Sequence, residues 1–62
     1  MNTVYKTVGI HEVRVDFISN AFTGMEYYFA DFVDNYKLEG YYGIGDTVDE
    51  AIDELFIDYM GE

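Results

Sequence analysis

The stretch GYYGIGDTVDEAIDEL, residues 40–55, joins a glycine-rich turn to the start of an amphipathic helix. Thr47 is a suitable N-cap for this helix, and Glu50, three residues later, completes a capping box. Apolar residues then recur with helical spacing and predict a helix over residues 48–60 with one apolar stripe. The stripe consists of Val48, Ala51, Ile52, Leu55, Phe56, Tyr59 and Met60.

The chain before this helix has the pattern of extended strands joined by turns. Residues 12–19 (EVRVDFIS) alternate apolar and polar side chains, as a strand with one buried face does. Residues 20–24 form a turn that ends in glycine, and residues 25–32 (MEYYFADF) favour a strand, so these segments predict a hairpin. Residues 36–44 (YKLEGYYGI) predict a third extended segment, with a bulge or a close approach at Gly40.

The first eleven residues (MNTVYKTVGIH) are compatible with either a flexible arm or an irregular strand, because Val4, Val8 and Ile10 lie at even spacing. The expected fold class is α+β: a three-stranded antiparallel sheet with one C-terminal amphipathic helix, in a single domain spanning residues 1–62. The chain has no cysteine, so neither disulfides nor thiolate metal sites can stabilise so small a core. Self-association is the remaining means of stabilisation.

Charge is the strongest signal in the composition. Thirteen Asp and Glu residues against three Lys and Arg give a formal net charge of -10, which repels nucleic acid and anionic membranes and favours a basic partner. Half of the residues are hydrophobic and 19% are aromatic, so we expect a folded domain and not a disordered acidic tail. The sequence has neither an apolar run of about 20 residues nor a signal-peptide core, and we expect a cytoplasmic protein.

The sequence fits neither a dinucleotide-binding loop, nor a catalytic site with a nucleophile, nor a calcium-binding loop. The turn around Gly43 and Gly45 lacks the third glycine of a dinucleotide-binding loop and has no Lys or Arg beside it. His11 next to Glu12 suggests a base and its orienting carboxylate, but no motif places a nucleophile. The carboxylates also miss the spacing of an EF-hand loop. We therefore predict no catalytic residue, no cofactor and no metal.

Two surfaces remain as candidate interfaces. Carboxylates one helical turn apart on the outer helix face either solubilise the protein or imitate the phosphates of a nucleic-acid backbone. Tyr and Phe residues crowd residues 27–42 on both strand parities, and one helix can cover only one side of a sheet. We expect the uncovered aromatic face to form a homodimer with a partner pocket beside it. The helix carboxylates are Asp49, Glu50, Asp53, Glu54 and Asp58.

Scattered motifs between residues 12 and 60 form a set: Tyr27-Tyr28, Leu38-Glu39, Tyr42-Gly43 and Thr47-x-Asp49-Glu50-x-Ile52. This set resembles the small dimeric uracil-DNA glycosylase inhibitors of short-tailed Bacillus phages, which are short, acidic, cysteine-free chains with a three-stranded sheet and a C-terminal helix. The resemblance implies a phage-encoded DNA mimic. Such a protein would occupy the DNA-binding groove of uracil-DNA glycosylase without binding nucleic acid itself.

The resemblance also implies a set of partner-binding residues. Carboxylates such as Glu26 and Glu39 would take phosphate positions in the basic groove of the enzyme. An apolar pocket at the dimer seam would enclose the apolar side chain that the glycosylase inserts into DNA. The family has a phenylalanine before the glutamate that matches Glu39, where this chain has Leu38, so either Leu38 or Tyr36 takes the caging role. The implied set is Glu26, Tyr28, Tyr36, Leu38, Glu39 and Tyr42.

A second resemblance concerns residues 43–55 (GIGDTVDEAIDEL). This segment is similar to the strand–turn–helix of HicB-type antitoxins, in which a glycine and an Asp-Thr pair precede a helix that starts with Glu-Ala. The match is short and consists largely of helix-start chemistry. It implies the alternative function, a HicB-like antitoxin fragment or another small acidic module for protein–protein interaction.

Overall fold

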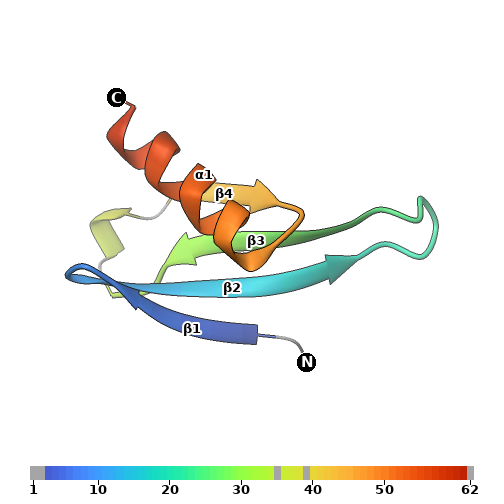
Figure 1. The fold of residues 1–62 in the computed structure, drawn as a ribbon, viewed down its shortest axis with the longest axis horizontal. Helices are drawn as coiled ribbons and strands as arrows, with labels where there is room; N and C mark the ends of the chain where they lie inside the picture. Colours follow the sequence, from blue (N-terminus) through green and yellow to red (C-terminus); the bar gives the residue numbers. More distant parts are fainter. Residues whose placement is uncertain (1–2, 35, 39, 62) are drawn as a thin grey trace.

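The computed structural model describes residues 3–34, 36–38 and 40–61. The elements follow in the order β1 (Thr3–Val8), β2 (His11–Ser19), β3 (Glu26–Phe32), a 3-10 helix η1 (Tyr36–Leu38), β4 (Tyr42–Gly45) and α1 (Val48–Met60). The strands form one antiparallel sheet in the order β1-β2-β3-β4, and α1 covers one face of it (Figure 1). The protein is therefore a small α+β fold with a four-stranded sheet and one C-terminal helix.

The N-terminal segment forms a strand, so the sheet has four strands and not the three expected. β1 pairs with β2 from Thr3 opposite Asp16 to Val8 opposite His11. Gly9 lies in the reversal between these strands with a φ of 64°, a conformation that is costly for residues with a side chain. The four central residues of β1 are exposed. Because this strand has no buried face at its centre, its sequence needs no strong apolar alternation, and that alternation is the signal that distinguishes a strand from a flexible arm.

β2 and β3 form the predicted hairpin, which extends well beyond α1 (Figure 1). Its turn is held by Asn20, whose side-chain oxygen accepts hydrogen bonds from the backbone N–H groups of Phe22 at 2.9 Å and Thr23 at 3.3 Å. Gly24 adopts a φ of 74° and donates its N–H to the Asn20 carbonyl at 2.8 Å. The turn is thus ordered by local hydrogen bonds, as its Asn and Gly residues predict.

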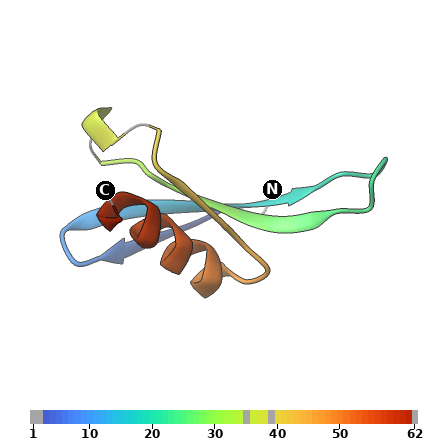
Figure 2. The ribbon, with the colours of Figure 1, turned by 90° about the horizontal axis from the view of Figure 1, so that it is seen from above.

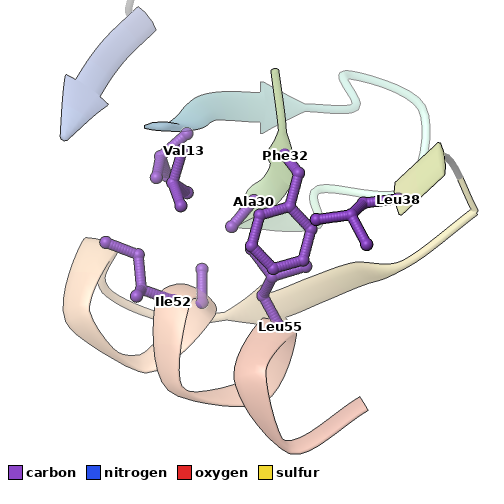
Figure 3. Close-up of a cluster of buried hydrophobic side chains, with 8 residues drawn as sticks. Val13, Ala30, Phe32, Leu38, Ile52 and Leu55 are labelled. Carbon is purple, nitrogen blue, oxygen red and sulfur yellow. The ribbon is translucent and has the colours of Figure 1, made fainter. Parts of the chain in front are cut away.

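The chain between β3 and β4 is not the continuous extended segment that the sequence suggested. Residues 36–38 form η1, Gly40 reverses the chain with a φ of 101°, and β4 contains only four residues. Leu38 is 9% exposed and points into the core (Figure 3), whereas Tyr42 and Ile44 are 51% and 46% exposed. A continuous strand over residues 36–44 would place these three side chains on one face, and that expectation is wrong because strand parity does not carry across an intervening helical turn.

α1 spans the predicted residues, and its N-terminus is capped by side chains. Thr47 Oγ1 accepts a hydrogen bond from the Glu50 N–H at 3.1 Å, and Glu50 Oε1 accepts one from the Asp46 N–H at 2.9 Å. The carboxylate therefore closes the capping box onto the residue before the N-cap. Met60, the last residue of the predicted stripe, is 75% exposed and does not join the core.

The core lies between α1 and the sheet (Figure 3). Its buried side chains come from both layers, with Leu38 of η1 closing one end. Val13, Val15 and Leu55 are the largest of the fully buried side chains, and burial of each contributes roughly 1.5–3 kcal/mol. The buried core residues are Val13, Val15, Ala30, Phe32, Leu38, Ala51, Ile52 and Leu55.

Two glycines of β4 allow α1 to lie directly on the sheet. A Cβ on Gly43 would collide with the backbone of Ala51 and Leu55, and a Cβ on Gly45 would lie 2.6 Å from the Ala51 nitrogen. Side chains on alternate residues of a strand point to one face, so both positions must be glycine for the helix to approach. This close packing explains the glycine-rich turn without any bound phosphate.

Candidate protein-interaction surface

The sheet has one covered face and one open face. Alternation along the strands places Val13, Val15 and Ala30 under α1, and the residues between them point to the opposite side. Figure 2 shows α1 on one side of the sheet and η1 toward the other side at one end. We call the uncovered side the open face. Its residues include Tyr5, Arg14, Asp16, Ile18, Tyr27, Phe29, Asp31, Tyr42 and Ile44.

The centre of the open face is a polar network around Arg14. Its guanidinium donates two hydrogen bonds to Asp31, from Nη2 at 2.8 Å and from Nε at 3.3 Å, and Nε also lies 3.6 Å from Asp16 Oδ2. The hydrogen bond and charge of Asp31 raise the pKa of Arg14 above its ordinary value. Thr3 Oγ1 donates to the remaining Asp16 oxygen at 2.6 Å. These contacts fix both carboxylates within the sheet surface.

The β3–β4 end of the open face is aromatic. The rings of Phe29 and Tyr42 stack with their centroids 5.4 Å apart and an interplanar angle of 9°. Ile44, directly opposite Phe29 in the strand register, extends this apolar surface. The exposed fraction of Tyr42 and Ile44 is about half in each case. This end of the face therefore presents apolar surface to solvent in the single chain.

A hollow of about 230 Å³ lies beside the stacked rings. Leu38 of η1 lines it together with Phe29 and Tyr42 of the sheet, and Gly40 forms part of its wall. Clefts for drug-sized ligands usually measure about 300–1,000 Å³, so this hollow suits a single side chain better than a small molecule. The residues that line it are Phe29, Asp31, Phe32, Leu38, Gly40, Tyr41 and Tyr42.

The structure brings together two of the predicted partner-binding residues, Leu38 and Tyr42, in this hollow. Tyr28 lies elsewhere, on the covered face, with its ring 5.2 Å from that of Phe17. Glu26 is exposed at the start of β3, beside the hairpin turn. Neither Tyr28 nor Glu26 lines the hollow with Leu38 and Tyr42.

Two further predicted residues fall on parts that are not described. Glu39 and the side chain of Tyr36 lie outside the described residues. The structure adds Phe29, which the sequence interpretation did not place in the site. Its position follows from strand alternation once Ala30, a small residue, is assigned to the covered face.

His11 and Glu12 do not form the pair of base and orienting carboxylate that their order suggested, because adjacent strand residues point to opposite faces. Glu12 Oε1 accepts a hydrogen bond from Thr7 Oγ1 at 2.9 Å. The His11 ring instead packs against aromatic rings, and its Nδ1 lies 3.8 Å from Asp34 Oδ2. Ring centroids of Phe32, Phe56 and Tyr59 lie 5.0, 6.0 and 5.7 Å from that of His11.

The outer face of α1 carries the predicted row of exposed carboxylates, and several have local roles. Asp49 Oδ1 lies 3.8 Å from Lys6 Nζ of β1, and Asp58 Oδ2 accepts the Tyr42 N–H at 3.4 Å. Within residues 3–34, 36–38 and 40–61, no three His, Asp or Glu side chains are grouped as a metal site would require.

The described part of the chain contains no helix with the length and apolar character needed to cross a membrane.

Comparison with known proteins identifies no relative of this chain: no family model, curated protein or solved structure matches it.

Proposed function

We propose that this protein is an acidic DNA mimic that inhibits a uracil-DNA glycosylase by occupying its DNA-binding groove. The observation that carries the proposal is the hollow between Phe29, Leu38 and Tyr42. Enzymes that flip a base out of DNA must supply the free energy needed to unstack it. Insertion of an apolar side chain between neighbouring bases is a common way to unstack them. The flat wall of the stacked rings, together with Leu38 in the same lining, suits the enclosure of such an apolar side chain.

The electrostatics support the same role. Enzymes that bind DNA place basic residues along the groove that holds the phosphates. The net charge of -10 favours approach to such a groove and opposes binding to DNA itself. Carboxylates one turn apart on α1 are spaced by about 5–6 Å, which gives a regular negative surface on a rigid element.

A homodimer through the open face is part of this proposal. Tyr5, Tyr42 and Ile44 are 60%, 51% and 46% exposed on this face in the single chain. Arg14 offsets part of the negative charge of Asp16 and Asp31 there, so two acidic chains can approach through this side with less repulsion than through α1. The hollow would then lie at the seam between copies, and the complex would form in the cytoplasm of a bacterial host.

The test is an excision assay with a bacterial uracil-DNA glycosylase and uracil-containing DNA. Purified protein in slight excess over the enzyme should abolish excision. Tyr42→Ala should weaken the inhibition, whereas Phe22→Ala should not, because Phe22 is a fully exposed aromatic residue at the hairpin turn, away from the hollow. A glycosylase that stays fully active with excess wild-type protein would overturn the proposal.

A HicB-like antitoxin is the second candidate. β4, the capped turn and α1 provide a strand–turn–helix at residues 43–55, the segment that resembles these antitoxins. An antitoxin would inhibit a toxin ribonuclease and leave the glycosylase unaffected. Assays of both enzymes with the same protein preparation separate the two candidates.

A further inference from the structure

β4 is an edge strand of the sheet, and its outer side is lined by backbone polar groups. The N–H of Tyr42 donates to Asp58 Oδ2, so it points away from β3. Backbone groups alternate in direction along an antiparallel strand, so the N–H and C=O of Ile44 point outward as well. This edge can therefore form hydrogen bonds with a further strand.

A second hollow, of about 330 Å³, lies along this edge. β4 supplies Tyr42, Gly43 and Ile44, and α1 supplies Glu54, Ile57 and Asp58, which lie at i, i+3 and i+4 on one helix face. α1 lies directly above Gly43, so its outer side borders the space beside the strand. Ile57 is 62% exposed in this position.

We propose that this edge binds an extended basic segment of a partner protein as a fifth strand. An added strand would direct alternate side chains to the two faces of the sheet. Those on the helix side would meet Glu54 and Asp58, which favour Lys or Arg. Those on the other side would lie next to Ile44 and Tyr42, which favour apolar residues. The segment that fits therefore alternates basic and apolar residues.

Charge decides between this partner and a second copy of the chain. Pairing of two β4 edges would bring two sets of Glu54 and Asp58 together in a protein that already carries a net charge of -10. Charged side chains beside an edge are a common protection against self-association. The same carboxylates attract a basic strand. The inference concerns the edge alone and does not depend on the proposed inhibition of a glycosylase.

An NMR titration of the ¹⁵N-labelled full chain tests the inference with a defined probe, a blocked hexapeptide in which Lys and Val alternate. We expect shift changes centred on the amides of Ile44, Gly45, Glu54 and Ile57, and slower hydrogen exchange of the Ile44 amide. Two control peptides should not bind: one with Glu in place of Lys, and one N-methylated at alternate residues so that it cannot extend the sheet.

Three outcomes of the peptide titration would overturn the inference. These are equal binding of the N-methylated peptide, shift changes confined to the open face around Tyr5, and the absence of any shift change at about 1 mM peptide, which would place Kd well above about 1 mM. Slower hydrogen exchange of the Ile44 amide at higher protein concentration without peptide would instead assign the edge to a second copy and would also overturn it, because side-chain contacts through the open face leave this backbone amide unpaired.

Matched variants test how much the charges of Glu54 and Asp58 contribute to the affinity for the peptide. The double variant Glu54→Gln, Asp58→Asn should bind the Lys-Val peptide roughly three- to tenfold more weakly, as expected for two exposed ion pairs. Asp53→Asn removes one carboxylate from the same helix outside the hollow and should change the affinity less than twofold. A double variant that binds like the wild type, with an unchanged circular dichroism spectrum, would contradict the role of these carboxylates.

Discussion

Phe29 of β3 and Tyr42 of β4 stack almost in parallel across neighbouring strands, with 5.4 Å between ring centroids. They are diagonal neighbours, because the strand register places Phe29 opposite Ile44 and Tyr42 opposite Asp31. Diagonal pairs on one sheet face are within reach for aromatic side chains. The stack forms a flat wall of the hollow that Leu38 closes, so the site depends on the register of two strands and on the position of η1.

The first prediction concerns this wall. Tyr42→Ala should reduce the affinity for the glycosylase by about 2 kcal/mol or more, roughly 30-fold, mainly through faster dissociation. The folding stability should change little, because half of the Tyr42 surface is exposed in the free protein. Surface plasmon resonance with immobilised enzyme measures the dissociation rate. Phe22→Ala serves as the control, and equal affinities for the two variants would argue against the hollow as the binding site.

The second prediction concerns the contact between α1 and β4. Gly43→Ala should destabilise the protein severely, because the added Cβ collides with the backbone of Ala51 and Leu55. Gly24→Ala should cost only about 1 kcal/mol, because its site is open and the penalty arises from its φ of 74° alone. Urea unfolding followed by circular dichroism compares the two variants. A larger loss for Gly24→Ala would contradict the close packing of α1.

Sequence patterns identified α1 and the β2–β3 hairpin, because each has a strong period and clear end signals. Thr47 and Glu50 mark the start of α1, and Val13 and Val15 alternate with charged residues along β2. Both signals, the helix start and the strand alternation, follow from local chemistry and can be recognised in a single sequence. The same patterns left the N-terminal segment undecided, since β1 is exposed over most of its length and gains its partners from β2.

The candidate site was only partly predictable for a related reason. Leu38 and Tyr42 belong to the partner-binding set that the resemblance implies, but their convergence with Phe29 depends on η1, which interrupts the expected strand. The resemblance places Tyr28 in the partner-binding set, whereas in the structure Tyr28 packs beside Phe17 on the covered face. Sequence composition shows that aromatic residues are abundant, whereas strand register decides which of them share a face.

The third prediction concerns assembly. The protein should be a dimer of 7.2 kDa chains at micromolar concentration, and sedimentation velocity measures this directly. Added salt should strengthen the dimer, because it screens the repulsion between two acidic chains. Tyr5→Asp and Ile44→Asp should each produce a folded monomer, since both positions are exposed on the open face. A wild-type monomer would remove the seam from the proposed mechanism.

The fourth prediction concerns His11. Its Nδ1 is buried without a hydrogen-bond partner among the described residues, and its ring packs against Phe32 and Tyr59. His11→Phe should keep the ring contacts and remove a buried nitrogen that lacks a hydrogen bond, with the loss only of its long 3.8 Å contact to Asp34. We expect the free energy of unfolding to rise by about 1 kcal/mol. Thermal unfolding at neutral pH measures the change. A lower midpoint temperature would show that the His11 nitrogen makes a favourable interaction.

The fifth prediction separates imitation of DNA from binding to DNA. The free protein should not bind duplex DNA at any salt concentration, because its net charge of -10 opposes contact with phosphates.

The association rate of the protein with the glycosylase should fall as salt rises, since screening shortens the range of steering to about 10 Å at 0.1 M salt. The dissociation rate should change less, because the apolar contacts of Tyr42 and Leu38 are insensitive to screening. Stopped-flow mixing at several salt concentrations yields both rates, with DNA binding followed by fluorescence anisotropy. An association rate independent of salt would contradict the electrostatic part of the proposal, and it would leave the hollow as the sole basis for recognition.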